Sequence, residues 1–185
     1  CAEAGASIVH FHARDPDTGE QRLDDTDLYR AAVKGVRAAG SDLHLYPSYP
    51  AFLSGRGDPL AERFGHVLAL ADDPDLAMRI APLDMGSLNF VIAEAGELAA
   101  IPLEASVYQN PFPLLQRMAE QCDARDLLVT LAIFEPGHLR LLLFENWRDA
   151  RGVLLMPGDG LILPLGFLRQ AGRELRSDRE IGRRR

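Results

Sequence analysis

Two histidines separated by one residue, His10 and His12, form the pattern in this sequence with the clearest chemical potential. They belong to a short apolar run, Ser7–His12, which ends in a polar turn around Asp15 and Gly19. Such a run favours a β-strand, and residues two apart on a strand point to the same side. Both imidazoles are therefore expected to project together from the end of the strand, as ligands for Zn²⁺ or a similar divalent metal.

Length, charge and cysteine content narrow the class of protein. The 185 residues fit one domain, and the net charge of −7 argues against a nucleic-acid binder, which usually carries a basic face. Cys1 and Cys122 are far apart in the chain, so no disulfide framework is indicated and a reducing, cytoplasmic location is expected. No stretch reaches the roughly 18 apolar residues of a membrane helix. We therefore expect neither a nucleic acid nor a membrane as a partner.

Strand and helix signals alternate along the chain, which is typical of a parallel α/β architecture. Strands are expected at Ser7–His12, Asp42–Tyr46, Arg79–Asp84, Leu127–Phe134 and Leu161–Leu163. Helices are expected at Asp24–Gly40, Pro59–Ala71 with Asp58 as N-cap, Pro111–Cys122, Leu139–Trp147 and Leu165–Ala171. Only loop is expected in the intervening segment Arg148–Gly160.

Five blocks of the sequence resemble the β-keto acid cleavage enzyme family, formerly a domain of unknown function. They are Gly5–Gly19, Glu62–His66, Ala81–Phe90, Val107–Asn110 and Ala132–Gly137. The blocks follow the family's order at near-family spacing, and the first and third carry its most specific patterns. The resemblance implies acyl exchange between a β-keto acid and acetyl-CoA, which gives acetoacetate and a new CoA ester.

The resemblance also implies a TIM-type (β/α)8 barrel, a fold that takes about 250 residues. We therefore expect residues 1–185 to form a single, incomplete barrel domain, with an internal deletion after Trp147. Cys1–Gly5 has the character of a last helical turn stopped by glycine, so the first strand is expected upstream of it. An incomplete barrel exposes strand edges, which favour association, and a homo-oligomer is expected.

A catalytic metal site needs a third ligand besides the two histidines. In the family this ligand is a glutamate near the C-terminus, four residues after a catalytic arginine. The resemblance places Arg176 on the arginine and Glu180 on the ligand, although Ile181 replaces the family's next acidic residue. A solvated charged tail stays open as the alternative for Glu180, and Asp15 and Asp84 stay open as alternative oxygen ligands.

Other residues match positions that bind substrate in the family. Ser48 stands where the family has a turn that holds the carboxylate of the keto acid, and Ser87 and Asn89 match a block of candidate hydrogen-bond donors. For all three, local turn capping stays open. Glu135 follows the strand expected at Leu127–Phe134, and active sites form at that end of barrel strands, so it is a candidate catalytic residue. A loop carboxylate without a catalytic role is the alternative.

Two other functions stay open. A metal-dependent hydrolase or aldolase on the same barrel would also use the histidine pair and a carboxylate. A degenerate or truncated relative would bind metal weakly and not catalyse. For the chain of 185 residues alone, very weak or absent acetyl-CoA-dependent cleavage is expected, because two ligands bind zinc poorly and missing strands loosen the site. Of the remaining histidines, His44 and His66 are expected to be structural and His138 to cap a helix.

Overall fold

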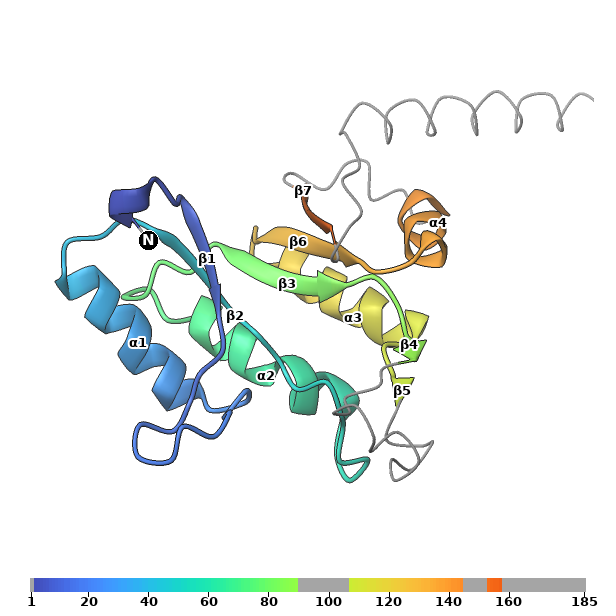
Figure 1. Ribbon diagram of the computed structural model, residues 1–185. Helices are drawn as coiled ribbons and strands as arrows, with labels where there is room; N and C mark the ends of the chain where they lie inside the picture. Colours follow the sequence, from blue (N-terminus) through green and yellow to red (C-terminus); the bar gives the residue numbers. More distant parts are fainter. Residues whose placement is uncertain (1, 90–106, 145–152, 158–185) are drawn as a thin grey trace, which may run out of the picture.

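The computed structural model describes residues 2–89, 107–144 and 153–157, which form an α/β arrangement of strands and covering helices (Figure 1). Its strands are β1 (Ile8–Phe11), β2 (His44–Pro47), β3 (Ile80–Asp84), β4 (Leu88–Asn89), β5 (Val107–Tyr108), β6 (Leu128–Ile133) and β7 (Val153–Pro157). Its helices are the 3-10 turn η1 (Ala2–Ala4) and the α-helices α1 (Thr26–Ala38), α2 (Pro59–Ala71), α3 (Phe112–Asp123) and α4 (Pro136–Phe144).

The longer strands pair in parallel, which confirms the α/β class predicted from the sequence. β1 pairs with β2, and β6 lies between β3 and β7 in a second parallel sheet. β2 runs beside β3, so the two sheets are neighbours (Figure 1). β4 and β5 form a short antiparallel pair after β3. Within the described residues the strands do not close a barrel.

The prediction that Arg148–Gly160 contains only loop is wrong for Val153–Pro157. These residues form β7, which pairs in parallel with β6 from Val129 to Ile133. The error has a physical reason, because an apolar run of five residues shows no alternation, and periodicity alone does not identify it as a strand. The missing strand that favoured an internal deletion is therefore present. The elements predicted at Leu161–Leu163 and Leu165–Ala171 lie outside the described residues.

Alternate strand residues build the core against the helices. Leu83 of β3 and Leu131 of β6 are fully buried against α2 and α3, and Leu45 of β2 packs with Tyr29 and other residues of α1. Because side chains alternate along a strand, the other set faces away from these helices. That set includes His10, Tyr46, Asp84 and Thr130.

Among the described segments, no helix has the length and apolar character needed to cross a bilayer.

Capping residues set the helix starts close to the predicted positions. Asp58 caps α2 by accepting a hydrogen bond from the Ala61 amide at 3.3 Å, and Pro59 is the first helical residue, as predicted. α4 begins at Pro136, three residues before its predicted start at Leu139. Its predicted end at Trp147 lies outside the described residues.

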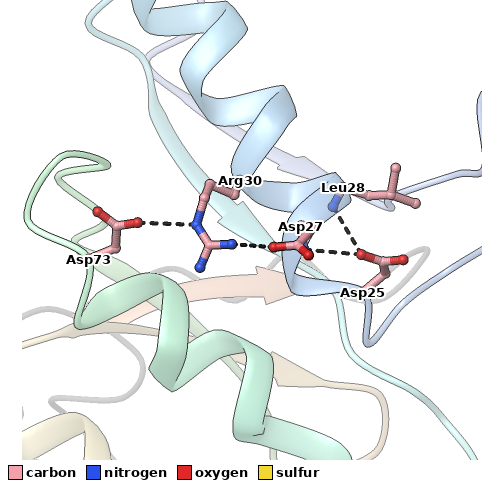
Figure 2. A network of polar contacts seen from close by, with 5 residues as sticks. All are labelled: Asp25, Asp27, Leu28, Arg30 and Asp73. Atoms are coloured by element: carbon pink, nitrogen blue, oxygen red, sulfur yellow. Dashed lines mark hydrogen bonds and ion pairs between the residues drawn. The ribbon is translucent and has the colours of Figure 1, made fainter.

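α1 is held at its N-terminus and docked on the loop after α2. Asp25 caps the helix by accepting hydrogen bonds from the Asp27 and Leu28 amides, each at 3.0 Å. Figure 2 shows Arg30 between two carboxylates, with its Nε 3.2 Å from Asp73 and its Nη1 bound to Asp27. Because Asp73 follows α2, this ion pair fixes α1 against the segment that leads into β3.

The polar turn predicted after the first strand is present. The Asp15 carboxylate accepts hydrogen bonds from the Asp17 amide at 3.0 Å and the Thr18 amide at 2.9 Å. Gly19 adopts a positive φ of 74°, which glycine tolerates without strain, and ends the turn. The turn returns the chain toward α1.

Candidate active site

His10 and His12 project from the end of β1 with their Nε2 atoms 3.2 Å apart. Val9 and Phe11 point the other way and pack against the core around Tyr29, as the strand period predicts. Two nitrogens bound to one tetrahedral Zn²⁺ at about 2.0–2.1 Å lie about 3.3 Å apart. The spacing of the two imidazoles therefore fits one divalent metal ion.

The surroundings keep both imidazoles neutral at neutral pH. The His10 ring packs on the ring of Tyr46, with centroids 4.7 Å apart. Partial loss of hydration lowers the pKa of His10, and the neighbouring His12 lowers it further. Loss of hydration and the charge of Arg14 lower the pKa of His12 in the same way. A neutral imidazole is the form that binds a metal, so both side chains are in the protonation state that metal binding needs.

Ser48 lies beside the histidine-bearing strand. Its amide donates a hydrogen bond to the Phe11 carbonyl at 3.1 Å, between the two histidines in sequence. Its own carbonyl accepts from Nε2 of His66 at 2.7 Å and from the Tyr29 hydroxyl at 3.4 Å. The main chain at Ser48 is therefore fixed on both sides. His66 is buried on α2, so the expectation that it is structural agrees with its position.

Asp84 ends β3 and lies among hydroxyl groups. The Tyr108 hydroxyl donates to its Oδ2 at 2.6 Å, and the Tyr49 hydroxyl accepts from its amide at 2.9 Å. Burial raises the pKa of the Asp84 carboxyl; hydrogen bonds from Tyr108 and Tyr49 oppose this, as do the charges of Arg63 and His138. Groups whose pKa is shifted by burial and by specific charged partners occur often at functional sites.

Ser87 lies in the turn after β3 and is bound from two directions. Its Oγ accepts a hydrogen bond from the Asn110 amide at 2.8 Å, and its carbonyl lies 3.3 Å from Nε2 of His138. Because the Ser87 oxygen acts as an acceptor here, its hydroxyl proton can donate to another group. Asn89 follows in β4, where it is exposed and pairs with Val107.

Glu135 lies in the turn between β6 and α4, where its side chain is exposed. Its Oε1 is 3.6 Å from Nε2 of His138, the atom that also approaches the Ser87 carbonyl. Nδ1 of His138 accepts from the Phe134 amide at 3.4 Å, so the ring joins the ends of β3 and β6. His138 is buried, and its ring places Glu135 near Ser87.

Hydrogen bonds between strand ends bring most of the predicted site residues to one edge. Phe11 bonds to Ser48 between β1 and β2, and Tyr49 bonds to Asp84 between β2 and β3. The Met85 amide bonds to the Ala132 carbonyl at 3.0 Å between β3 and β6. The residues that this edge carries are His10, His12, Ser48, Ser87, Asn89 and Glu135.

Two of the predicted residues, Arg176 and Glu180, lie outside the described residues. Within the residues that the structure describes, no group of three His, Cys, Asp or Glu side chains could hold a metal ion. Of the alternative oxygen ligands, Asp15 binds the amides of its own turn and Asp84 binds Tyr108. The described side chains therefore include no third ligand beside His10 and His12.

Sequence reasoning missed three polar residues that support this edge: Arg63, Tyr108 and Asn110. Arg63 is fully buried and donates to the Ala51 carbonyl at 2.9 Å and to Oδ1 of Asn110 at 3.2 Å. Helical spacing gave a usable signal, because it places Arg63 on the buried face of α2 beside His66, where charge is unusual. Tyr108 and Asn110 carry no comparable signal, since their partners are distant in the chain.

Comparison with known proteins places this chain among enzymes. Residues 1–154 match the family described as beta-keto acid cleavage enzyme. The chain is also 30% identical over 156 residues to the 3-dehydrocarnitine:acetyl-CoA trimethylamine transferase of Rhizobium meliloti (strain 1021). That alignment covers 75% of this chain and 45% of the relative, so the chain spans a little less than half of the relative's length. The family match includes the histidine pair and ends before Arg176 and Glu180.

Proposed function

The chain belongs to the beta-keto acid cleavage enzyme family, and we propose that it exchanges acyl groups between a β-keto acid and acetyl-CoA. The products are acetoacetate and a new CoA ester. The observation that carries the proposal is the His10–His12 pair, whose Nε2 atoms lie 3.2 Å apart at the edge that also holds Ser48 and Ser87. The Rhizobium meliloti relative is named for acetyl-CoA, which supports the same co-substrate here.

His10 and His12 would hold Zn²⁺ or another divalent metal, with Glu180 as the third ligand. The nitrogen spacing supports the first two ligands, and the match of the tail to the family pattern supports the third. When bound, such an ion acts as a Lewis acid that polarises the keto oxygen of the substrate. A site with three protein ligands keeps one position open for that oxygen.

Ser48, Ser87 and Asn89 would bind the polar groups of the keto acid. Ser87 has a hydroxyl proton to donate because its oxygen already accepts from Asn110. Ser48 is held through its main chain by Phe11 and His66, so its side chain starts from a fixed position. Donors that are fixed before the substrate arrives need little reorganisation during the reaction, which is the basis of electrostatic stabilisation.

Cleavage of a β-keto acid also needs a base for the carbon between its two carbonyl groups, and the proton must later return. Glu135 is proposed for catalysis because it is an exposed carboxylate at the end of β6, 3.6 Å from the histidine that binds Ser87. Arg176 is proposed to complement the negative charge that develops on the substrate. The assignment of Arg176 follows the family pattern, whereas that of Glu135 follows from its place at the end of β6, where the active sites of barrels form.

We further propose that the parallel strands belong to a (β/α)8 barrel, of which the alternation of β1, α1, β2, α2 and β3 is one part. A cytoplasmic location is proposed because the chain is poor in cysteine and the Cys122 thiol is free and buried. A homo-oligomer is proposed because, among the described residues, β1 and β7 each pair on one side only.

The test is acetyl-CoA-dependent turnover of a panel of short β-keto acids by the 185-residue chain, with acetoacetate and the CoA ester both measured. His10→Ala and His12→Ala should abolish turnover, whereas His44→Ala, an exposed histidine at the start of β2, should not. Product formation that does not need acetyl-CoA would instead indicate a hydrolase or aldolase. A metal-loaded chain without turnover of any keto acid would contradict the proposal and favour the alternative of a degenerate or truncated relative, for which very weak or absent cleavage by the 185 residues alone is expected.

A further inference from the structure

Arg63 is a charged side chain with no exposed surface. It donates to the Ala51 carbonyl and to Oδ1 of Asn110, while its Nε has no hydrogen-bond partner. Within the described residues, no carboxylate lies within ion-pair distance of it. Burying a cation without a carboxylate in contact is strongly unfavourable, and an apolar side chain of similar shape would often pack there at lower cost. The position therefore calls for a role beyond packing.

Tyr108 and Asn110 connect Arg63 to the end of β3. Tyr49, whose hydroxyl accepts from the Asp84 amide, lies beside them with its ring centroid 5.7 Å from the guanidinium carbon. The guanidinium carbon lies 4.8 Å from the centroid of the Tyr108 ring, a cation–π contact, and the Tyr108 hydroxyl binds the Asp84 carboxylate. The Asn110 side chain donates to the Asp84 carbonyl, and the Asn110 amide donates to Oγ of Ser87 at 2.8 Å. Arg63 therefore contacts Tyr108, which binds Asp84, and Asn110, which binds both Asp84 and Ser87.

The opposite side of the same turn is already closed. Gly86 has a φ of 151°, and a Cβ built there would lie 2.8 Å from Cδ2 of His138. The histidine ring thus packs directly on the main chain, next to its contact with the Ser87 carbonyl. The turn is therefore in contact with His138 on one side and with Asn110, which Arg63 holds, on the other.

We infer that Arg63 is a positioning residue of the active site, which acts through Asn110 and Tyr108 to fix the Ser87 hydroxyl and the Asp84 carboxyl. The inference rests on the proposed function only in treating Ser87 as a residue that binds substrate. With Asn110 held, Oγ of Ser87 accepts the hydrogen bond from the Asn110 amide, and its hydroxyl proton can be donated to another group. With Tyr108 held, the hydrogen bond from Tyr108 and the charge of Arg63 oppose the rise that burial causes in the Asp84 pKa. Tyr49 and His138 also lie near Asp84 and lower its pKa.

The experiment compares Arg63→Met and Arg63→Lys with a matched control, Arg125→Met. Arg125 joins α3 to Asp72 at the end of α2 through bonds of 2.8 and 3.0 Å, so the control removes the same charge away from β3. Hydrogen exchange by NMR is measured for the Asn110 amide and for the Leu131 amide in β6. The pH titration of the Asp84 carboxyl carbon is followed in the same samples.

In Arg63→Met, the Asn110 amide should lose at least about tenfold more protection than the Leu131 amide, and the Asp84 pKa should rise. Arg63→Lys, which cannot reproduce both bonds of the guanidinium, should show the same changes in weaker form and serves if the methionine variant does not fold. Arg125→Met should lower the protection of both amides equally. Equal loss at Asn110 and Leu131 in the Arg63 variants, or an unchanged Asp84 pKa, would overturn the inference.

Turnover gives a second readout. If the wild type converts a β-keto acid, Arg63→Lys should lower kcat/KM at least about tenfold while Arg125→Met leaves it unchanged. An unchanged kcat/KM in Arg63→Lys would also overturn the inference. Absence of turnover in the wild type counts against the proposed function alone, because hydrogen exchange and the Asp84 titration need no substrate.

Discussion

Arg63 and His66 lie one turn apart on α2, and both bind main-chain oxygens in the segment after β2. Arg63 donates to the Ala51 carbonyl at 2.9 Å, and Nε2 of His66 lies 2.7 Å from the Ser48 carbonyl. The same helix contributes Phe64 and Val67 to the core. α2 therefore closes the core and also fixes the strand edge that carries the candidate site, so its polar residues link stability to function.

Acidification should destabilise the protein through His66. Its imidazole is buried and its Nδ1 has no hydrogen-bond partner, so burial lowers its pKa. The folded protein then binds this proton less readily than the unfolded chain, in which histidine titrates near about 6.5. Stability should be unaffected above about pH 6.5 and should fall as the pH drops from there to the lowered folded value.

Urea unfolding between about pH 7.5 and 5 measures this effect, with His66→Gln as the comparison. Glutamine can still donate to the Ser48 carbonyl but does not titrate. His10 and His12 also have lowered pKa values, and they contribute equally in both proteins. The difference in slope between wild type and His66→Gln therefore isolates His66, and equal slopes would contradict the prediction.

Gly86→Ala should destabilise the fold by about 2–4 kcal/mol. Its φ of 151° is rarely adopted by residues with a side chain, and the new Cβ would lie 2.8 Å from the ring of His138. Gly35→Ala is the matched control, since Gly35 lies inside α1 with open space around its Cβ position. That change should stabilise by about 0.5–1 kcal/mol. Similar unfolding free energies for the two variants would show that the turn adapts to a side chain.

Tyr108→Phe should lower the free energy of unfolding by an amount that depends on pH. Burial raises the pKa of the Asp84 carboxyl, so the folded protein binds a proton at Asp84 more readily than the unfolded chain does. The stabilisation that comes from this proton is lost as the pH rises from the pKa of the unfolded chain, about 3.9, to the raised pKa of the folded protein. The Tyr108 hydroxyl opposes that loss by binding the charged carboxylate at 2.6 Å. Its removal should therefore cost about 1–3 kcal/mol near pH 7 and less near about pH 4, where Asp84 takes up its proton.

Tyr29→Phe is the control for this comparison. Tyr29 is also fully buried, and its hydroxyl donates to the neutral Ser48 carbonyl at 3.4 Å. Its loss should cost the same at both pH values, because no carboxylate depends on it. A cost of Tyr108→Phe that does not change with pH would mean that Asp84 does not need the hydroxyl to ionise.

Local signals in the sequence predicted the parts of the fold that local chemistry decides. Asp58 and Pro59 fixed the start of α2, and the two-residue period of a strand placed His10 and His12 on one side. The β4–β5 pair is not predicted, because strands of two residues are too short to show a period. β7 has five residues, but all of them are apolar, so the run shows no alternation that would indicate a strand.

The supports of the candidate site depend on contacts between distant parts of the chain. Asn110 binds Ser87 across 23 residues, and Arg63 binds Asn110 across 47. No spacing rule connects such pairs before the strands are placed side by side. The edge that carries the site was predictable from parallel α/β topology, whereas the buried network behind it was not.

The last prediction is that Zn²⁺ stabilises the chain through His10 and His12. Their nitrogen spacing of 3.2 Å suits one ion, and nitrogen ligands favour Zn²⁺ over Mg²⁺, which prefers oxygen. At a free concentration about a hundredfold above Kd, zinc should add about 2.7 kcal/mol of stability and raise Tm, whereas Mg²⁺ should not. His10→Ala and His12→Ala should each lose this rise and the bound metal found by elemental analysis. His44→Ala should keep both, because that exposed side chain starts β2, while the site lies at the end of β1. Undiminished zinc in both site variants would show that the metal binds elsewhere in the chain.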